Sequence, residues 1–395
     1  MLSAWIVVAV VQGVWIILLS FRGLFWLPRP VLRVAREPEG RERVVPVSAV
    51  IPARDEEEIL GSTLPTVLRQ RYSGNLSVVV VDDRSEDGTA DVARDSARKC
   101  GGQARLTVCS GLPLLEGWAG KVWAMAQGAR HPIVQEATYL WFTDADIAHS
   151  PDVLQALVSK AEADSLDLVS VMARLRVDSW WDRLLIPAFV YFFAKLYPFR
   201  LVNNPRRRTA GAAGGCLLMR RTALERAGGV EAIRDALIDD CAMGRLIKRS
   251  GGRVWLGFSQ DIRSIRRYGT LKSIWDMVAR SAYDQLGYSS WLLCGTVLGM
   301  LILYALAPVA TLWGAVGLGL GTPGSLMLTA LGAATWGTMA ASFAPILRHH
   351  RVGVQWAPLL PLAGVLYTLM TVSSAWRHRT GRGGAWKGRT RGASP

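Results

Sequence analysis

Two long apolar runs at opposite ends of the sequence limit what this chain can fold into. Residues 4–20 carry no charge, and in residues 291–376 the only basic or acidic side chains stand in the cluster from Arg348 to Arg351. Apolar stretches of about 18 residues or more are long enough to cross a bilayer as helices. Residues 40–285, between the two runs, have ordinary polarity. The pattern predicts a water-exposed globular domain carried on α-helical transmembrane segments.

The first run has two readings, a cleaved signal peptide or an uncleaved anchor. It lacks a basic n-region and a small-residue cleavage site, and Trp5, Trp15 and Trp26 suit the interfaces of an anchor. Six arginines follow within residues 22–43. By the positive-inside rule, we expect residues 1–27 to be an anchor and residues 44–288 to form a cytoplasmic domain of a multi-pass inner-membrane protein.

Net charge and cysteine content limit the kinds of partner and the compartment that we expect for this chain. The net charge is +15, but the basic residues form no recognisable nucleic-acid-binding module, so we expect no nucleic-acid partner. Arginines beside the membrane, facing anionic lipid, explain the surplus more simply. The five cysteines contain no C-x-x-C pair, which fits reduced thiols in a cytoplasmic domain.

Strand-like apolar runs alternate with helical segments in the first half of the polar stretch. We expect strands at residues 47–51, 76–81, 106–108 and 139–142. This alternation predicts an α/β fold with a parallel, doubly wound sheet, and such sheets bind ligands beyond the carboxyl ends of their strands. The acidic residues expected at that edge are Asp55, Asp82, Asp83, Asp144 and Asp146.

The acidic edge indicates the kind of ligand. No glycine-rich phosphate loop opens the helices, which disfavours an ordinary dinucleotide or ATP fold. Asp144 and Asp146 can share one divalent cation, Mg²⁺ or Mn²⁺, that also holds phosphate oxygens, and Asp83 can accept a hydrogen bond from a base N–H. A D-x-D triplet by itself is often an acidic pair in a surface turn; three acidic clusters on one edge are harder to explain in that way.

Four motifs, in this order, carry a family resemblance: VSAVIPARDEEE, VVVVDDRSEDGTA, GWAGKVWA and FTDADI. Together they resemble the family 2 glycosyltransferases, which implies a Rossmann-like nucleotide-sugar (GT-A) domain with a mostly parallel sheet. The segment GWAGK is similar to the branch with the hopene-associated (hopanoid biosynthesis) and carotenoid-ester glycosyltransferases. The resemblance covers about residues 47–290, and GGAWKGR at 383–389 adds to it.

The resemblance implies roles for individual residues. The positions that resemble nucleotide-contacting residues of the family are Pro52, Arg54, Glu56, Asp83, Lys121 and Asp144, with Asp82 as a further candidate. Asp83 resembles the carboxylate that reads uracil, and Lys121 the basic residue near the diphosphate, where a cation offsets the charge of the leaving group. The alternative for Lys121 is a solvated lysine at a helix start. Asp144 and Asp146 resemble the metal-binding pair.

The segment IDDCAMGRL resembles the family motif E-D-x-x-L-G, with Asp239 in place of Glu and Met243 in place of Leu. Asp240 would then be the general base that takes the proton from an acceptor hydroxyl, and partial burial should raise its pKa toward working pH. A helix N-cap role for Asp239 or Asp240 is the alternative. The preceding glycine turn, with Gly214 and Gly215, borders the acceptor site in the family.

The next helix sets a limit on the reaction. Processive polysaccharide synthases of the family carry Q-x-x-R-W there, whereas residues 274–286 offer Arg280 but no R-W pair. The missing pair predicts transfer of a single sugar to a small lipid acceptor. The resemblance implies a UDP-sugar as the nucleotide-sugar donor and a hopanoid as the lipid acceptor. Direct displacement by the acceptor would invert the anomeric centre, since no second carboxylate is evident as a covalent nucleophile. Alternatives are a carotenoid, diacylglycerol or polyprenyl phosphate acceptor, or a membrane protein that senses nucleotide or translocates lipid without catalysis.

The remaining apolar segments define the membrane part. Residues 180–202 are aromatic-rich but interrupted by charges, which predicts an interfacial helix; an ordinary buried helix pair is the alternative. We expect spans at residues 291–317, 325–347 and 355–376. A third full crossing would put the basic tail, residues 377–395, outside, against the positive-inside rule. Either Pro358 and Pro361 mark a re-entrant segment or the number of spans differs.

Overall fold

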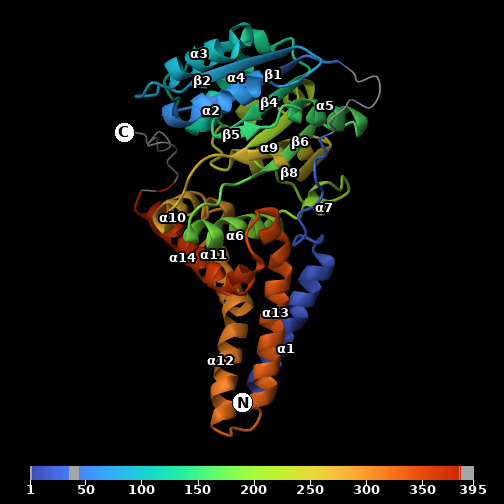
Figure 1. The fold of residues 1–395 in the computed structure, drawn as a ribbon, viewed down its shortest axis with the longest axis vertical. Helices are drawn as coiled ribbons and strands as arrows, with labels where there is room; N and C mark the ends of the chain where they lie inside the picture. The colour runs from blue at the N-terminus through green and yellow to red at the C-terminus, as the bar shows by residue number, and fades with distance from the viewer. Residues whose placement is uncertain (1, 35–43, 382, 384–395) are drawn as a thin grey trace. The chain divides into compact units, whose positions relative to one another are not determined.

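The computed structural model describes residues 2–34, 44–381 and 383 (Figure 1). The chain divides into two units: a helical unit of residues 1–28, 177–200 and 267–383, and an α/β unit that contains residues 29–176 and 201–266. Segments 177–200 and 267–288, which we expected inside the globular domain, belong instead to the helical unit. They do so because their helices pack against the long C-terminal helices.

One eight-stranded sheet organises the α/β unit, in the order β3-β2-β1-β4-β7-β6-β8-β5. The strands are β1 (Val47–Ala53), β2 (Leu76–Asp82), β3 (Leu106–Ser110), β4 (Tyr139–Thr143), β5 (Ile147–His149), β6 (Leu168–Arg174), β7 (Cys216–Arg220) and β8 (Val254–Ser264). The half β3-β2-β1-β4 is wholly parallel, as the alternating pattern predicts. In the other half β7 runs antiparallel to β4 and β6, and β5 antiparallel to β8, while β6 and β8 are parallel.

Helices follow most of these strands in the α/β unit. They are α2 (Glu57–Leu68), α3 (Thr89–Cys100), α4 (Gly120–Arg130), α5 (Val153–Ala163), α8 (Arg221–Arg226) and α9 (Asp239–Arg249), with the short helix α7 (Phe199–Val202) at the boundary with the helical unit. Single 3₁₀ turns lie at Gln103–Arg105, Pro132–Val134 and Val230–Ile233.

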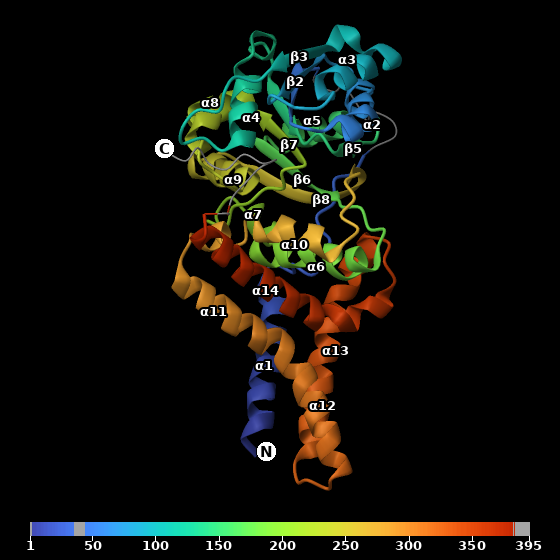
Figure 2. The ribbon, with the colours of Figure 1, turned by 90° about the vertical axis from the view of Figure 1, so that its left-hand side faces the viewer.

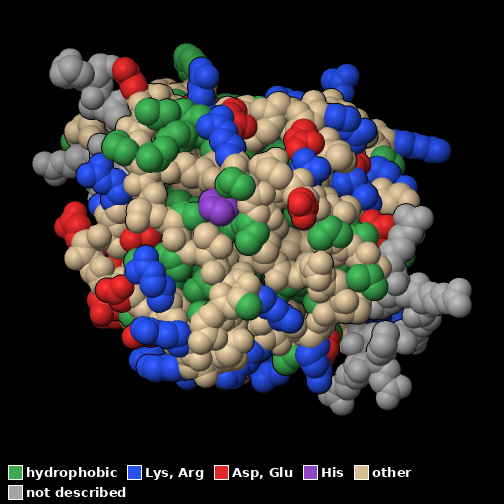
Figure 3. Space-filling view, turned by 90° about the horizontal axis from the view of Figure 1, so that it is seen from above, with side chains coloured by type: hydrophobic (Ala, Val, Ile, Leu, Met, Phe, Trp, Pro, Cys, Tyr) green, Lys and Arg blue, Asp and Glu red, His purple; other side chains and the backbone are tan. Residues whose placement is uncertain are grey.

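The face drawn in Figure 3 carries acidic and basic side chains interspersed among hydrophobic ones.

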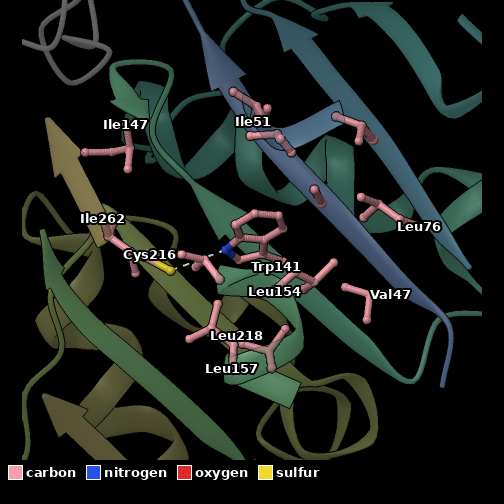
Figure 4. Packing of buried hydrophobic residues seen from close by; sticks show 14 of the residues in the cluster. Val47, Ile51, Leu76, Trp141, Ile147, Leu154, Leu157, Cys216, Leu218 and Ile262 are labelled. Atoms are coloured by element: carbon pink, nitrogen blue, oxygen red, sulfur yellow. Dashed lines mark hydrogen bonds between the residues drawn. The ribbon is translucent and has the colours of Figure 1, made fainter. Parts of the chain in front are cut away.

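A buried apolar cluster of the α/β unit joins the sheet to helices α2, α3 and α5, and Figure 4 draws part of it. Trp141 of β4 is fully buried, and its Nε1 donates a hydrogen bond to Sγ of Cys216 on β7 at 3.3 Å. Leu154 and Leu157 of α5 are fully buried beside it. A buried aromatic ring of this size contributes a large share of the apolar area removed from water, and its N–H needs the partner that the sulfur supplies.

The helical unit consists of long apolar helices and shorter connecting ones. They are α1 (Leu2–Phe21), α6 (Trp180–Leu196), α10 (Leu271–Ala279), α11 (Ser290–Met300), α12 (Leu306–Gly319), α13 (Ser325–His349) and α14 (Leu360–Arg379). A π-helical turn, Leu301–Ala305, joins α11 to α12, and 3₁₀ turns lie at Asp284–Leu286 and Val354–Leu359. Figure 2 shows α1, α12 and α13 running side by side, with α11 and α14 inclined across their direction.

Among the residues that the structure describes, five segments are long and apolar enough to cross a membrane: Ala4–Phe21, Trp180–Val202, Ser290–Gly319, Ser325–His349 and Val354–Arg379. They include the expected anchor and the three expected C-terminal spans, which indicates membrane association. The segment around α6 differs from the others because 61% of it is buried inside the protein. Tyr191 on this helix bonds Ser342 at 2.7 Å, and Tyr367 donates to the Leu185 carbonyl at 2.9 Å.

Glycines let α12 and α13 approach closely. A Cβ at Gly332 would lie 2.7 Å from the backbone nitrogen of Thr311, and one at Gly314 equally close to the backbone nitrogen of Thr329. Small residues at such contacts allow membrane helices to gain dispersion energy where no hydrophobic effect drives their association. The two helices therefore form a tight hairpin.

Candidate active site

The candidate site is built from the carboxyl ends of β1, β2 and β4 together with the first turns of α4 and α9. Asp144 directly follows β4, and Oγ1 of Thr143 donates to the Gly215 carbonyl at 2.9 Å, which fixes the end of β4 to the loop before β7. The Ile147 N–H closes a turn on the Asp144 carbonyl at 3.2 Å. Burial raises the pKa of Asp144, Lys121 opposes this shift, and the nearby charge of Asp146 raises the pKa further.

Lys121 is the centre of the charge arrangement. It lies in the first turn of α4, and its Nζ is 2.7 Å from Oδ1 of Asp144 and 3.0 Å from Oδ2 of Asp239. Burial by itself lowers the pKa of Lys121, but Asp144 and Asp239 outweigh burial and raise it above the usual value. Only 19% of the side chain is exposed, so Lys121 is not the solvated lysine of the alternative reading.

Asp239 and Asp240 are the first two residues of α9, and the N-cap is Ile238, so neither acid fills the N-cap position of the alternative reading. Oδ2 of Asp240 accepts the Gly214 N–H at 2.8 Å, and Oδ1 accepts the N–H of Cys241 at 2.6 Å. Burial and the charge of Asp239 raise the pKa of Asp240 to about 6, against the opposing effect of Lys121 and the two N–H groups. Such a pKa suits a general base near neutral pH.

Asp146 is held by Ser264, the last residue of β8, and by Arg266 just beyond it, neither of which sequence reasoning found. Arg266 donates from Nε to Oδ2 of Asp146 at 3.1 Å and from Nη2 to Oε1 of Glu56 at 2.7 Å. Oγ of Ser264 donates to the same Asp146 oxygen at 2.8 Å. The available signal was an arginine directly beyond a strand end. It was easily overlooked, because Glu56 stands 210 residues earlier in the chain.

Asp83 and Arg54 connect the ends of β1 and β2. Nη1 of Arg54 donates to the carbonyls of Asp83 and Arg84 at 2.7 and 2.8 Å, and the Asp83 N–H donates to the Ala53 carbonyl at 2.8 Å. Asp83 is fully buried. Gly111, after β3, approaches so closely that a Cβ there would lie 3.3 Å from Oδ1 of Asp83. This packing fixes the carboxylate that we expect to read the base.

The other predicted residues occupy different surroundings. Pro52 is a buried residue of β1 opposite Val81, and Oδ1 of Asp82 accepts the Ser85 N–H at 3.1 Å. Arg280 is exposed at the C-cap of α10 in the helical unit. Its role in the site therefore stays a prediction from sequence.

Two carboxylates of the site could bind a divalent cation. Asp144 and Asp146 supply carboxylate oxygens, the ligands that Mg²⁺ and Mn²⁺ take. Within residues 2–34, 44–381 and 383, the structure has no group of three or more His, Cys, Asp or Glu residues that could hold a metal. Mg²⁺ in nucleotide sites is commonly bound by one or two carboxylates and substrate phosphates, so the pair fits a cation whose other ligands come from a nucleotide.

The fold is that of a GT-A glycosyltransferase domain. Residues 45–278 match the family described as Glycosyltransferase like family 2, and the chain therefore belongs to that family. The mannosyltransferase PcManGT from Pyrobaculum calidifontis, solved in complex with GDP-Man and Mn²⁺, has the same fold, with a TM-score of 0.55 at 18% identity over 95% of this chain and 98% of that one.

Two curated relatives match shorter stretches. The undecaprenyl-phosphate 4-deoxy-4-formamido-L-arabinose transferase of Edwardsiella ictaluri is 27% identical over 177 residues, covering 44% of this chain and 47% of the relative. The 4,4'-diaponeurosporenoate glycosyltransferase of Staphylococcus aureus is 31% identical over 116 residues, covering 29% and 28%. The chain thus spans less than half the length of these curated relatives.

Proposed function

We propose that this protein transfers one sugar from a UDP-sugar to a hydroxyl group of a membrane lipid, a hopanoid, with inversion at the anomeric carbon. The observation that carries the proposal is the position of Asp240, a half-buried carboxylate of raised pKa beside the Lys121–Asp144 ion pair. This arrangement puts a proton acceptor next to groups suited to a diphosphate, which is what direct displacement from a nucleotide sugar needs.

In the proposed reaction, the acceptor oxygen forms a bond to the anomeric carbon as the bond to the nucleoside diphosphate breaks. Asp240 takes the hydroxyl proton, and its two backbone hydrogen bonds keep the carboxylate oriented toward the acceptor. Lys121 offsets negative charge on the departing diphosphate. Asp144 and Asp146 would hold a divalent cation, which when bound neutralises diphosphate charge.

Asp240 favours a hydroxyl over an ionised acceptor. A phosphate or carboxylate acceptor is already an anion near neutral pH and needs no base, whereas a lipid hydroxyl must lose its proton during attack. A half-buried acid with a pKa of about 6 is useful only in the second case. The two curated relatives, an undecaprenyl-phosphate sugar transferase and a diaponeurosporenoate glycosyltransferase, support a lipid-linked acceptor in general. The hopanoid is chosen because of the GWAGK segment.

The helical unit suggests a topology that removes the conflict with the positive-inside rule. The start of α1 and the α12–α13 turn lie at one end of the bundle formed by α1, α12 and α13 (Figure 2). At the other end, Arg22 follows α1 and Arg348 lies in the last turn of α13. Since α14 is inclined and its Arg377 pairs with Asp276 of α10 at 2.7 Å, we propose that α14 does not cross. Its basic end then stays cytoplasmic.

The test uses the purified protein in lipid with a panel of UDP-sugars and Mg²⁺ or Mn²⁺, measuring UDP release with and without a hopanoid polyol. Release that needs the metal and rises with the lipid supports both substrates. Release that rises instead with undecaprenyl phosphate or a carotenoid would replace the hopanoid. Tight UDP binding without turnover on any of these lipids would contradict the role of Asp240 as a base.

A further inference from the structure

Both carboxylates of the D-x-D pair are already neutralised by basic side chains. Asp144 pairs with Lys121 at 2.7 Å, and Asp146 pairs with Arg266 at 3.1 Å. Oδ2 of Asp146 also accepts the Ser264 hydroxyl at 2.8 Å, so this oxygen holds two donors at once. The side chains are mostly shielded from water, since Asp146 is 12% and Arg266 30% exposed.

A divalent cation must compete with these partners. Mg²⁺ requires oxygen ligands at about 2.0–2.1 Å with near-ideal geometry, and the lone pairs of Asp146 Oδ2 already accept from Arg266 and Ser264. A cation that approached the pair by itself would also meet the positive charges of Lys121 and Arg266, and repulsion at a partly buried site is weakly screened. A cation that binds through Oδ2 of Asp146 therefore has to displace Arg266 or Ser264 from this oxygen.

A bound nucleotide can offset both the occupied Asp146 oxygen and the repulsion by the basic side chains. Its diphosphate supplies oxygen ligands that the described part of the protein lacks, since no group of three or more His, Cys, Asp or Glu residues is present there. It also supplies negative charge with which a displaced guanidinium can pair. Arg266 is suited to this exchange because its second nitrogen stays bound to Glu56 at 2.7 Å, which keeps the side chain at the site.

We infer that Arg266 makes metal binding conditional on nucleotide. In the free protein Arg266 occupies Asp146; when metal and nucleoside diphosphate arrive together, Arg266 releases Asp146, keeps Glu56 and pairs with the diphosphate. Arg266 is a positioning residue in this scheme. The inference rests on the proposed metal-dependent nucleotide site, and linkage requires that nucleotide and metal strengthen each other's binding by the same factor.

The experiment measures Mn²⁺ affinity by electron paramagnetic resonance on the full-length protein in lipid nanodiscs, with and without UDP, or GDP if UDP does not bind. We expect wild-type protein to bind Mn²⁺ at least tenfold more tightly with nucleotide. Arg266→Gln should bind Mn²⁺ at least fivefold more tightly than wild type without nucleotide, and gain less from nucleotide. Arg267→Gln is the matched control, because that neighbouring side chain is 74% exposed and should leave both affinities unchanged.

Several outcomes separate this inference from the proposed function. Equal Mn²⁺ affinity with and without nucleotide in wild type would overturn the role of Arg266 while leaving a metal-dependent enzyme intact. Weaker Mn²⁺ binding by Arg266→Gln under both conditions would show that Arg266 only organises Asp146. No Mn²⁺ binding even with nucleotide would instead contradict the proposed metal dependence. If Arg266→Gln does not fold, Arg266→Lys should show the same change at reduced size, because one ammonium nitrogen replaces the two guanidinium nitrogens that contact Asp146 and Glu56.

Discussion

The backbone N–H of Gly214 donates to Oδ2 of Asp240 at 2.8 Å, and this contact fixes the carboxylate that we assign as the base. Because the Cys241 N–H binds the other oxygen, each carboxylate oxygen keeps a lone pair for an acceptor hydroxyl. The base is therefore oriented by main chain of the glycine turn and of its own helix, without a second acidic side chain as support.

Replacing Asp240 with Asn should abolish transfer while nucleotide still binds. General base catalysis is worth about 10²- to 10⁴-fold, so we expect a loss of that size in turnover, with UDP affinity changed by less than about threefold. Turnover is followed by UDP release and affinity by calorimetry. Asp91→Asn, in an exposed ion pair with Arg94, is the control. A variant that kept full biological function without turnover would support the nucleotide-sensing alternative.

The pH dependence of kcat/KM should reflect the ionisation of Asp240. Asp240 must be deprotonated to accept a proton, and its pKa is raised to about 6, so kcat/KM should fall tenfold per pH unit below that value. The charged groups that shift this pKa are Asp239, which raises it, and Lys121, which lowers it. An activity that stayed constant from pH 7 to pH 5 would exclude Asp240 as the titrating base.

Removing the Lys121 charge should shift the pH below which kcat/KM falls. Since Lys121 lowers the pKa of Asp240, Lys121→Met should shift the midpoint of the kcat/KM profile to higher pH, in addition to reducing the rate. The shift of the midpoint, measured on the residual activity, distinguishes an electrostatic role from simple loss of structure. An unchanged midpoint would mean that Lys121 does not act on the base.

Gly214→Ala should impair catalysis with little effect on folding. An added Cβ would lie 3.3 Å from Oδ2 of Asp240, so the carboxylate must shift by a few tenths of an ångström, whereas the 3.5 Å to Nζ of Lys121 is ordinary van der Waals contact. Misplacement of a base by about 1 Å can cost about 10²-fold, and a smaller shift should lower kcat several-fold. Steady-state kinetics together with a thermal melt test this expectation, with Gly337→Ala, where a Cβ meets nothing within 4 Å, as the control.

Gly332→Ala should destabilise the α12–α13 hairpin. The new Cβ would lie 2.7 Å from the backbone nitrogen of Thr311, which cannot move without separating the helices. Overpacking of this kind costs about 1–3 kcal/mol in the free energy of unfolding. Thermal unfolding in lipid should show the loss, and Gly337→Ala on the same helix should not. Equal stability of the two variants would show that the contact is not tight.

The proposed topology can be read from cysteine labelling. In a Cys294→Ser background, Thr322→Cys in the α12–α13 turn should react with a membrane-impermeant maleimide added outside intact cells. Thr380→Cys, directly after α14, should react only after the membrane is opened. Labelling of both sites from outside would mean that α14 crosses the membrane.

Local sequence was enough to predict the elements that carry the site. Apolar runs gave the four parallel strands β1 to β4, and acidic residues at their ends marked the ligand edge, because strand period and strand termini are local properties. Asp144, Asp239 and Lys121 were each singled out from motifs, and the structure brings them together. The length and charge of the apolar runs likewise determined which segments are candidate spans.

Only the tertiary structure decided the rest. The antiparallel entry of β7 and β5, the inclusion of residues 177–200 in the helical unit, and the bond of Arg266 to both Glu56 and Asp146 depend on residues far apart in sequence. No local period encodes such meetings; they follow from the path of the whole chain and from the need to bury apolar faces and pair buried charges. The sequence by itself determined the elements and their chemistry, and the fold decided which charges face one another.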